Sequence, residues 1–336
     1  MTDFAQTLRR RIARRPATLV AFAVSLVLLV LPAFVNAYAL SSYRDVILFA
    51  IFALSLDVFW GKTGILSFGH ATFFGLGAYG MAVTGIHFEI DPSIVSLVGL
   101  LVGVGLAALV ALLVGYFILF GGVRGAYFTI VTLALTLIAN HIAVGWSSVT
   151  GGDSGLIGVP PLVIFGLSFV DPFRSYYLCL AVLLAFLFGS IAIMNGRFGL
   201  ILTAIQDDET KAQTLGYRTS LLLLVTFVAS ASMAGLAGAL YAAMNGFVAP
   251  DMIALLLSTE VIIWVAVGGS GTLIGAIIGT FVVWWLQQEI SSFNASAWPI
   301  AIGSFFIALV LFFPNGPVAL VSEKLRRFRQ KEGGQQ

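Results

Sequence analysis

The sequence has little charge and few residues of the kinds that bind metals. Only 10% of its 336 residues are charged and 60% are hydrophobic, whereas a soluble globular domain carries roughly one quarter charged residues. The single cysteine, Cys179, excludes a disulfide framework and a thiolate metal cluster. His70, His87 and His141 are isolated, and a zinc site needs about three or four grouped ligands. The composition therefore indicates an integral membrane protein without a metal centre.

Two further kinds of site are missing from the sequence. Gly61-Lys62-Thr63 resembles the end of a phosphate-binding loop, but the glycine that opens such a loop is replaced by Leu56. The residues before Gly61 form an apolar run and not the strand-to-helix turn that the loop occupies. A cluster of nucleophile, base and orienting residue is also lacking. We therefore expect neither a nucleotide site nor an enzyme.

Long uncharged runs are what the sequence has in abundance. A helix crosses a bilayer in about 20 apolar residues, and small residues such as Gly allow membrane helices to pack closely. We expect an all-α integral membrane protein, a single domain over residues 1–336, with about ten transmembrane or half-membrane helices, the eighth too short for an ordinary span. These pieces lie near residues 17–36, 44–60, 70–86, 93–119, 125–146, 174–194, 219–245, 256–269, 272–290 and 297–313.

The positions of Lys and Arg predict the orientation of the chain. With ten pieces, all of the 17 basic residues except Arg44 and Arg174 fall on one side. Because cytoplasmic loops carry an excess of Lys and Arg, we expect both termini in the cytoplasm, with a basic segment 1–16, a loop 195–218 and a basic tail 314–336. The tail suits anionic lipid and not nucleic acid.

The amino-terminal end allows two interpretations. Basic residues precede an apolar run, and Ala37-Tyr38-Ala39 could be a cleavage site for a signal peptide. The apolar run over residues 17–35 is longer than a removed signal core. We expect an uncleaved first helix, and the signal peptide is the alternative.

The cytoplasmic loop 195–218 is polar but favours a helix. Asp207, Asp208 and Glu209 suit a helix amino terminus, where they complement its dipole, and Gly216 suits the position just past a carboxyl end. The sequence therefore predicts a short helix over residues 206–215 on the cytoplasmic face.

Carboxylates and helix breaks inside the membrane pieces are candidates for the transport pathway. A buried carboxylate in a membrane is costly and often functional, and broken membrane helices tend to border a cavity. Both features also have an explanation in helix packing. A carboxyl can hold helices together through hydrogen bonds, and the glycines of a helix break can allow helices to approach closely. The breaks are expected at residues 61–69 and 268–272, and the pathway candidates are Asp57, Ser67, His70, Glu260, Gly269 and Gly271.

Three stretches of the chain resemble a known family. They are GKTGILSFGHATFFGLGAYG, then GAYFTIVTLALTLIANHI followed by SSVTGGDSGLIGVPP, and GRFGLILTAIQDDETKAQTLGY with the later GGSGTLIGAIIGT. In order and spacing they are similar to permease subunits of the branched-chain amino-acid ABC importer family. The chain departs from the family at Asp57, where Asn is frequent, and at Lys62, where an aromatic residue is frequent. Asp57-x2-Trp60-Gly61 resembles the urea permease branch of the family.

The resemblance implies a fold of the type II-like kind, which sugar and cobalamin permeases share, and a place in the bacterial inner membrane. It implies no cofactor and no ATP hydrolysis by this chain. The implied partners are a second permease subunit, two cytoplasmic ATPase subunits and a periplasmic substrate-binding protein. The implied cargo is a branched-chain or other amino acid, and urea or a short amide is the alternative. Apart from the resemblance, a competing function is an ion-coupled secondary transporter, powered through Asp57 or Glu260. The resemblance assigns ATPase coupling to Arg197, Asp207, Asp208, Glu209, Lys211, Leu215 and Gly216.

Overall fold

The structure is a computed structural model that describes residues 20–88, 91–293 and 303–304. The expected segments 1–16 and 314–336 lie outside the described residues, as does nearly all of the expected piece 297–313.

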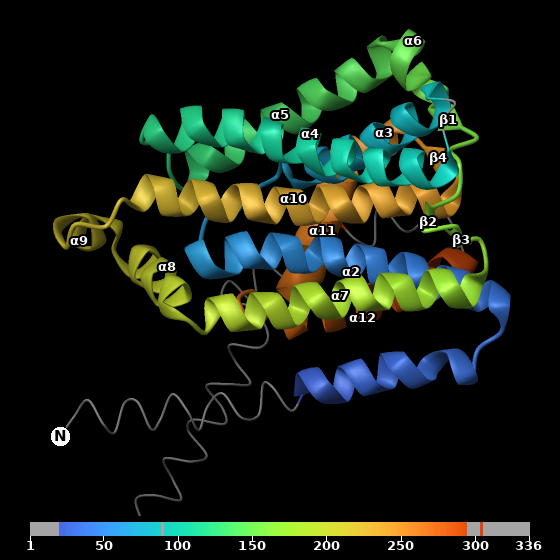
Figure 1. Ribbon diagram of the computed structural model, residues 1–336. Coiled ribbons are helices and arrows are strands. Elements are labelled where there is room, and N and C mark those ends of the chain that lie inside the picture. Colours follow the sequence, from blue (N-terminus) through green and yellow to red (C-terminus); the bar gives the residue numbers. More distant parts are fainter. Residues whose placement is uncertain (1–19, 89–90, 294–302, 305–336) are drawn as a thin grey trace, which may run out of the picture.

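Helices make up most of the described chain, and Figure 1 shows the long ones running side by side. Five of them, α2, α4, α5, α7 and α10, are long and apolar enough to cross a membrane by length and composition, counted over the described residues. The long helices are α2 (Ala37–Thr63), α3 (His70–His87), α4 (Pro92–Phe120), α5 (Ala126–Gly145), α7 (Pro172–Met194), α10 (Thr219–Asn245), α11 (Leu255–Gly268) and α12 (Ile274–Phe293).

Shorter elements connect the long helices. An apolar helix over Val20–Ala33, which ends in the 3₁₀ turn η1 (Leu31–Ala33), precedes α2. Strand β1 (Leu156–Ile157) pairs antiparallel with β4 (Phe247–Val248), and β2 (Val163–Ile164) pairs with β3 (Leu167–Ser168). The β1–β4 pair ties the long segment 147–173 to the residues that follow α10, whereas β2 and β3 form a hairpin within that segment. The remaining short elements are α6 (Ser147–Thr150), α8 (Arg197–Asp207), α9 (Glu209–Thr214), η2 (Gly152–Ser154) and η3 (Pro250–Ile253).

Local sequence signals set the ends of the long helices. Asp91 and Asp171 cap α4 and α7 through hydrogen bonds from backbone N–H groups, and each precedes a proline in the first turn. This pairing of an acidic cap with a first-turn proline is a strong start signal. Gly64 and Gly246 follow α2 and α10 in the left-handed conformation, with φ of 74° and 68°. Glycine adopts that conformation without a side-chain penalty, so both helices end there.

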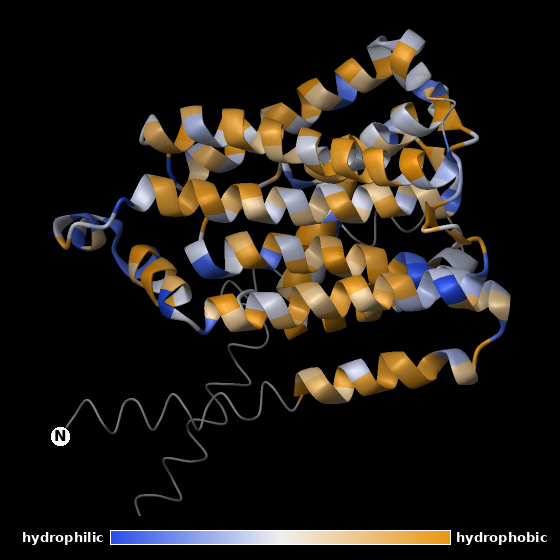
Figure 2. Ribbon diagram, viewed as in Figure 1, coloured by the Kyte–Doolittle hydropathy of each residue, from blue (hydrophilic) through white to orange (hydrophobic). Residues whose placement is uncertain are grey.

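The centre of the bundle is formed by α2, α3 and α10, which pack through small residues. A Cβ on Gly77 would overlap the carbonyl group of Gly235, and one on Gly238 would overlap the carbonyl oxygen of Phe74. Such close approach is typical of membrane helices. In contrast, α4 and α5 expose many large apolar side chains, and Figure 2 shows hydrophobic residues along both helices. The outer surface of the bundle is therefore suited to lipid or to another apolar subunit.

Two local predictions were wrong. The cytoplasmic loop does not hold one helix over 206–215; the chain forms α8 and α9, which meet at Asp208 with φ of −161°. The extended backbone of Asp208 ends α8, and its side chain accepts a hydrogen bond from Lys211 N at 3.0 Å to start α9. The second expected piece was also too short, because α2 runs from Ala37 to Thr63 and includes Gly61 and Lys62. The helix break therefore begins at Gly64.

Candidate functional site

The helix pair α8–α9 lies at one end of the bundle, opposite the short strands, and α9 projects past the long helices (Figure 1). Helix α9 has two faces. Ala212 is buried and Glu209 is half-buried, whereas Lys211 and Leu215 are exposed, Leu215 to 75%. Just past the helix, Gly216 has φ of 88°, a left-handed value that glycine readily adopts. The outward face of α9 is therefore available to a partner.

The inward face of α9 is held by one arginine that the sequence reasoning did not select. The Nε of Arg124, in the turn between α4 and α5, donates to Glu209 Oε2 at 2.8 Å, and its Nη2 donates to Glu209 Oε1 at 2.9 Å. The Thr219 hydroxyl, at the start of α10, donates to Glu209 Oε1 at 2.8 Å. One sequence signal was available: among Asp, Glu, Lys and Arg, only Arg124 occurs between Asp91 and Asp153.

The two acidic residues at the start of α9 are held as carboxylates. Burial raises the pKa of the Glu209 carboxyl, but hydrogen bonds from Arg124 and Thr219 and the Arg124 charge lower it by more, so that this pKa lies below its ordinary value. Exposed Asp208 also has a lowered pKa, because the backbone N–H of Lys211 donates to its carboxylate. Of the other coupling candidates, Arg197 and Asp207 are the first and last residues of α8, and both are exposed.

The second group of candidates meets where α2 approaches the loop between α11 and α12. Asp57 is fully buried, and its carboxylate accepts the backbone N–H of Gly271 at 2.5 Å and that of Leu273 at 2.7 Å. Lys62, one turn further along α2, donates to the carbonyl oxygen of Gly271 at 2.7 Å. A Cβ on Gly61 would overlap the backbone of Gly271. The two expected helix-break regions are therefore in direct contact.

The conformation of the α11–α12 loop explains why it needs these contacts. Gly269 and Gly271 have φ of 92° and 83°, and Leu273, a buried residue with a side chain, has φ of 59°. A positive φ costs a residue such as leucine about 1–3 kcal/mol. Asp57 bonds the N–H of Leu273 directly, so it stabilises the strained residue. We call Asp57, Lys62 and the loop residues 269–273 the loop clamp.

The third group surrounds the start of α3. His70 is fully buried, and its Nε2 lies 2.8 Å from the Ser55 hydroxyl. That hydroxyl donates to Phe52 O at 2.6 Å, so His70 Nε2–H is the donor to Ser55. Ser67 is also buried and accepts the N–H of Gly69 at 3.3 Å. The His70–Ser55 bond joins α2 to the start of α3, whereas the other ring nitrogen, His70 Nδ1, is buried without a hydrogen-bond partner among the described residues.

The remaining acidic candidate, Glu260, is half-buried in α11. Within the described residues, no group of three or more His, Cys, Asp or Glu side chains could hold a metal ion. Of the pathway candidates, Asp57 and Gly271 are in direct contact, and Ser67 and His70 lie at the start of α3.

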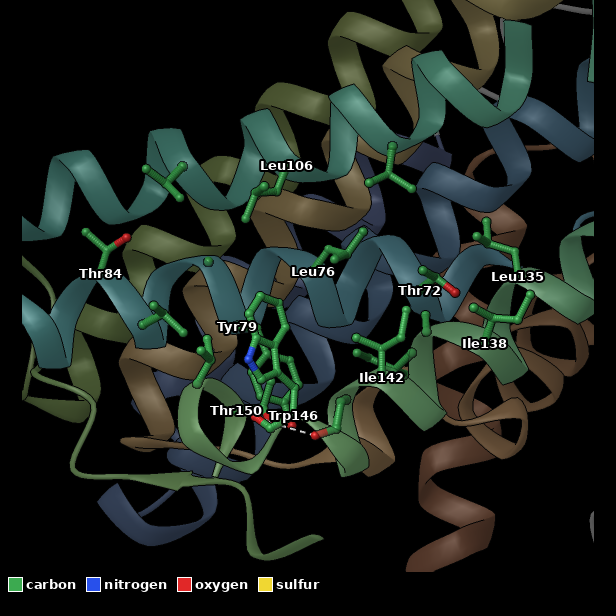
Figure 3. A pocket seen from close by; sticks show the side chains of 18 residues that line it. Thr72, Leu76, Tyr79, Thr84, Leu106, Leu135, Ile138, Ile142, Trp146 and Thr150 are labelled. Atoms are coloured by element: carbon green, nitrogen blue, oxygen red, sulfur yellow. Dashed lines mark hydrogen bonds between the residues drawn. The ribbon is translucent and has the colours of Figure 1, made fainter. Parts of the chain in front are cut away.

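An apolar cavity of about 360 Å³ lies between α3, α4 and α5 (Figure 3). Leu76, Leu106 and Ile142 point into it from the three helices. The Thr150 hydroxyl at its edge is already bonded to Ala143 O at 2.6 Å. None of the lining residues is Asp, Glu, Lys or Arg. The cavity can accept an aliphatic group, but its lining offers no charge to pair with an ammonium or carboxylate.

Together, the bundle and its end-on helix pair define a multi-pass, all-α membrane protein of the permease class. The chain belongs to the family of permease components of branched-chain amino acid transport systems, whose family model matches residues 38–314. This confirms the family that the sequence motifs indicated. As a permease component of an ABC transporter, the chain works in a complex with other subunits, and separate subunits hydrolyse ATP.

Several curated proteins are similar to the chain over most of its length. The high-affinity branched-chain amino acid transport permease LivM of Salmonella typhimurium is 25% identical over 314 residues, which cover 86% of this chain and 72% of LivM. LivM of Escherichia coli K12 is 25% identical, with 83% and 69% covered. The autoinducer 2 import permease LsrC of Salmonella paratyphi B is 29% identical, with 70% and 73% covered. No solved structure matches the chain.

Proposed function

We propose that the chain is the permease subunit of an ATP-driven importer that moves branched-chain amino acids from the periplasm to the cytoplasm across a bacterial inner membrane. The family match over residues 38–314 carries this proposal. The LivM relatives, whose names specify branched-chain amino acids, support the cargo.

The complex that we propose contains four further subunits, which are of three kinds. A second permease subunit completes the pathway, two cytoplasmic ATPase subunits supply energy, and a periplasmic substrate-binding protein delivers the amino acid. The large apolar surface of α4 and α5 is suited to a second permease as well as to lipid. The single domain 1–336 has about ten membrane pieces in a type II-like fold, and both termini face the cytoplasm, as the Lys and Arg distribution favours.

Helix α9 is the element that we propose docks on an ATPase subunit. Its projection from the end of the bundle and its exposed Lys211 and Leu215 support this role. An element that only joined two spans would not need a separately capped helix with one outward face. The residues assigned to this docking region remain Arg197, Asp207, Asp208, Glu209, Lys211, Leu215 and Gly216.

The geometry of Asp57 bears on the choice of cargo and energy source. Its carboxylate is occupied by two backbone N–H groups, so the Asp57-x2-Trp60-Gly61 motif serves the loop clamp and does not favour urea. A proton relay would need carboxylates that exchange partners, whereas the Asp57 carboxylate on α2 is held by two N–H groups of the α11–α12 loop. We therefore propose a packing role for Asp57 in place of a pathway contact, and we keep Glu260 as the remaining pathway candidate.

A reconstituted complex in proteoliposomes tests the proposed function. With the binding protein and labelled leucine outside and ATP inside, we expect uptake that stops when ATP is replaced by a non-hydrolysable analogue. Excess unlabelled valine should compete, and excess urea should not. Uptake driven by a sodium or proton gradient without ATP would overturn the proposal.

A further inference from the structure

A single guanidinium group joins three helices at the end of the bundle that carries α9. Besides its bonds to Glu209 on α9, Arg124 donates through Nη1 to the carbonyl oxygens of Leu119 at 2.8 Å and Val123 at 3.0 Å, at the end of α4. Its Nη2 also donates to the Ser220 hydroxyl of α10 at 3.0 Å. An arginine is suited to such a junction because its planar group presents five donors in a fixed arrangement.

The Glu209 carboxylate is equally committed. It accepts from Arg124 and from Thr219, and the Gln213 amide lies 3.4 Å from Oε1. Both partners of the ion pair are largely shielded, with 23% and 25% of their side chains exposed. Shielding from water strengthens a charge-assisted, two-point contact. The junction is therefore more rigid than an exposed surface ion pair.

The backbone of α9 has its main helix contacts with α8 and α10. The turn between α4 and α5, in contrast, reaches α9 through the long side chain of Arg124. A force applied to the outward face of α9 must pass through these contacts to move the long helices. Arg124 connects α9 directly to the end of α4 and to the turn that precedes α5.

We propose that the Arg124–Glu209 ion pair is the link that transmits movement of α9 to the α4–α5 turn and to α10, so that Arg124 is a positioning residue for coupled transport. This inference rests on the proposed function of the chain as an ATP-driven permease. It gives Glu209 a role facing the membrane helices, whereas Lys211 and Leu215 face the docking partner.

The test compares variants in the complete transporter, reconstituted with its partner subunits. The variants are Arg124→Ala, Arg124→Lys and Glu209→Gln, and the quantity measured is labelled leucine imported per ATP hydrolysed. Docking is measured separately, by replacing Leu215 with the photo-reactive p-benzoylphenylalanine and scoring cross-links to the ATPase subunit. The matched control is Asp45→Asn, which removes a second partly buried ion pair, Arg44–Asp45; this pair lies beside Asn245, at the end of α10 opposite to Thr219.

We expect Arg124→Ala and Glu209→Gln to lower leucine per ATP about tenfold, within the usual range for coupling between sites, while the cross-link and ATP hydrolysis persist. Arg124→Lys should fall between these variants and the wild type, because one ammonium group cannot reproduce the two-point contact. Asp45→Asn should lower the yield of assembled complex and leave the ratio unchanged.

Two outcomes would overturn the inference. An unchanged ratio in assembled Arg124→Ala transporter would mean that the ion pair transmits nothing. Loss of the cross-link together with transport would mean that Arg124 only shapes the docking surface. Neither outcome affects the proposed function, which is tested separately by ATP-dependent leucine import in the wild-type complex.

Discussion

The loop clamp makes a quantitative prediction for Asp57→Asn. Asparagine keeps one acceptor oxygen for Gly271 or Leu273, but its amide group faces the other backbone N–H as a second donor. The loss of one charge-assisted bond and the unsatisfied buried N–H cost about 2–4 kcal/mol together. At about 2 °C per kcal/mol for a chain of this size, we expect the melting temperature Tm to fall by about 4–8 °C.

The chain contains its own reporter for this experiment. Cys179 is the only cysteine and is fully buried, so a maleimide dye reports unfolding of the purified chain in detergent. Asp153→Asn, a change to an exposed carboxylate in η2, is the matched control and should shift Tm by no more than about 1 °C, as expected of a surface substitution. Leucine uptake per assembled Asp57→Asn transporter should remain close to that of the wild type. A wild-type Tm combined with abolished uptake would refute the clamp and place Asp57 in contact with the cargo.

Three further predictions follow from the structure. Gly238→Ala should prevent recovery of folded protein in a size-exclusion assay, because the added Cβ would overlap the Phe74 carbonyl oxygen of α3. The control is Gly105→Ala, which has open space around the added Cβ; it should keep the yield of folded protein and raise the free energy of unfolding by up to about 1 kcal/mol. Because the folded pKa of Glu209 is lowered, the stability that its carboxylate contributes is present above the unfolded pKa and is lost as pH falls through the folded pKa. The amount of leucine imported per ATP should therefore be constant from about pH 8 to 6. A fall of this ratio within that window would contradict the assignment of Glu209 as a stable carboxylate. Double replacement of Lys211 and Leu215 by Ala should reduce ATPase co-purification with the permease while leaving Tm unchanged; unaltered co-purification would show that this face of α9 does not dock.

The long helices were largely predictable because each depends on local sequence. The expected piece 219–245 coincides with α10, and 93–119 differs from α4 by one residue at each end. Apolar runs of this length have few alternatives in a membrane. The division at Asp208 was missed because the same acidic residues suit either a helix interior near its start or a cap, and only the packing of Leu202 and Ile205 on the bundle fixes α8.

The contacts within the candidate sites could not be read from one sequence. Asp57 and Leu273 are 216 positions apart, and Arg124 and Glu209 are 85 apart. Residue type indicated that Asp57 needed a partner, because a bare carboxylate is costly in a membrane. Which partner it has depends on how the helices stack, and that stacking is set by many small-residue contacts that no local pattern specifies.

Two of the described ion pairs, Arg44–Asp45 and Arg124–Glu209, share one structural role with the loop clamp, and this role bears on the source of energy. Arg44 joins Asp45 on α2 to Asn245 at the end of α10, the loop clamp joins α2 to the α11–α12 loop, and Arg124 joins α4 to α9 and α10. Charges fixed in this way set the positions of helix ends, whereas a proton or sodium relay needs groups that change partners during transport. Glu260 is tested in that role by Glu260→Gln, which keeps the size of the half-buried side chain and removes its charge. If transport needs no ionisable carboxyl in α11, ATP-driven leucine uptake per assembled transporter should stay close to that of the wild type. Loss of uptake in assembled Glu260→Gln transporter, restored by Glu260→Asp, would show instead that an ionisable carboxyl in α11 takes part in transport.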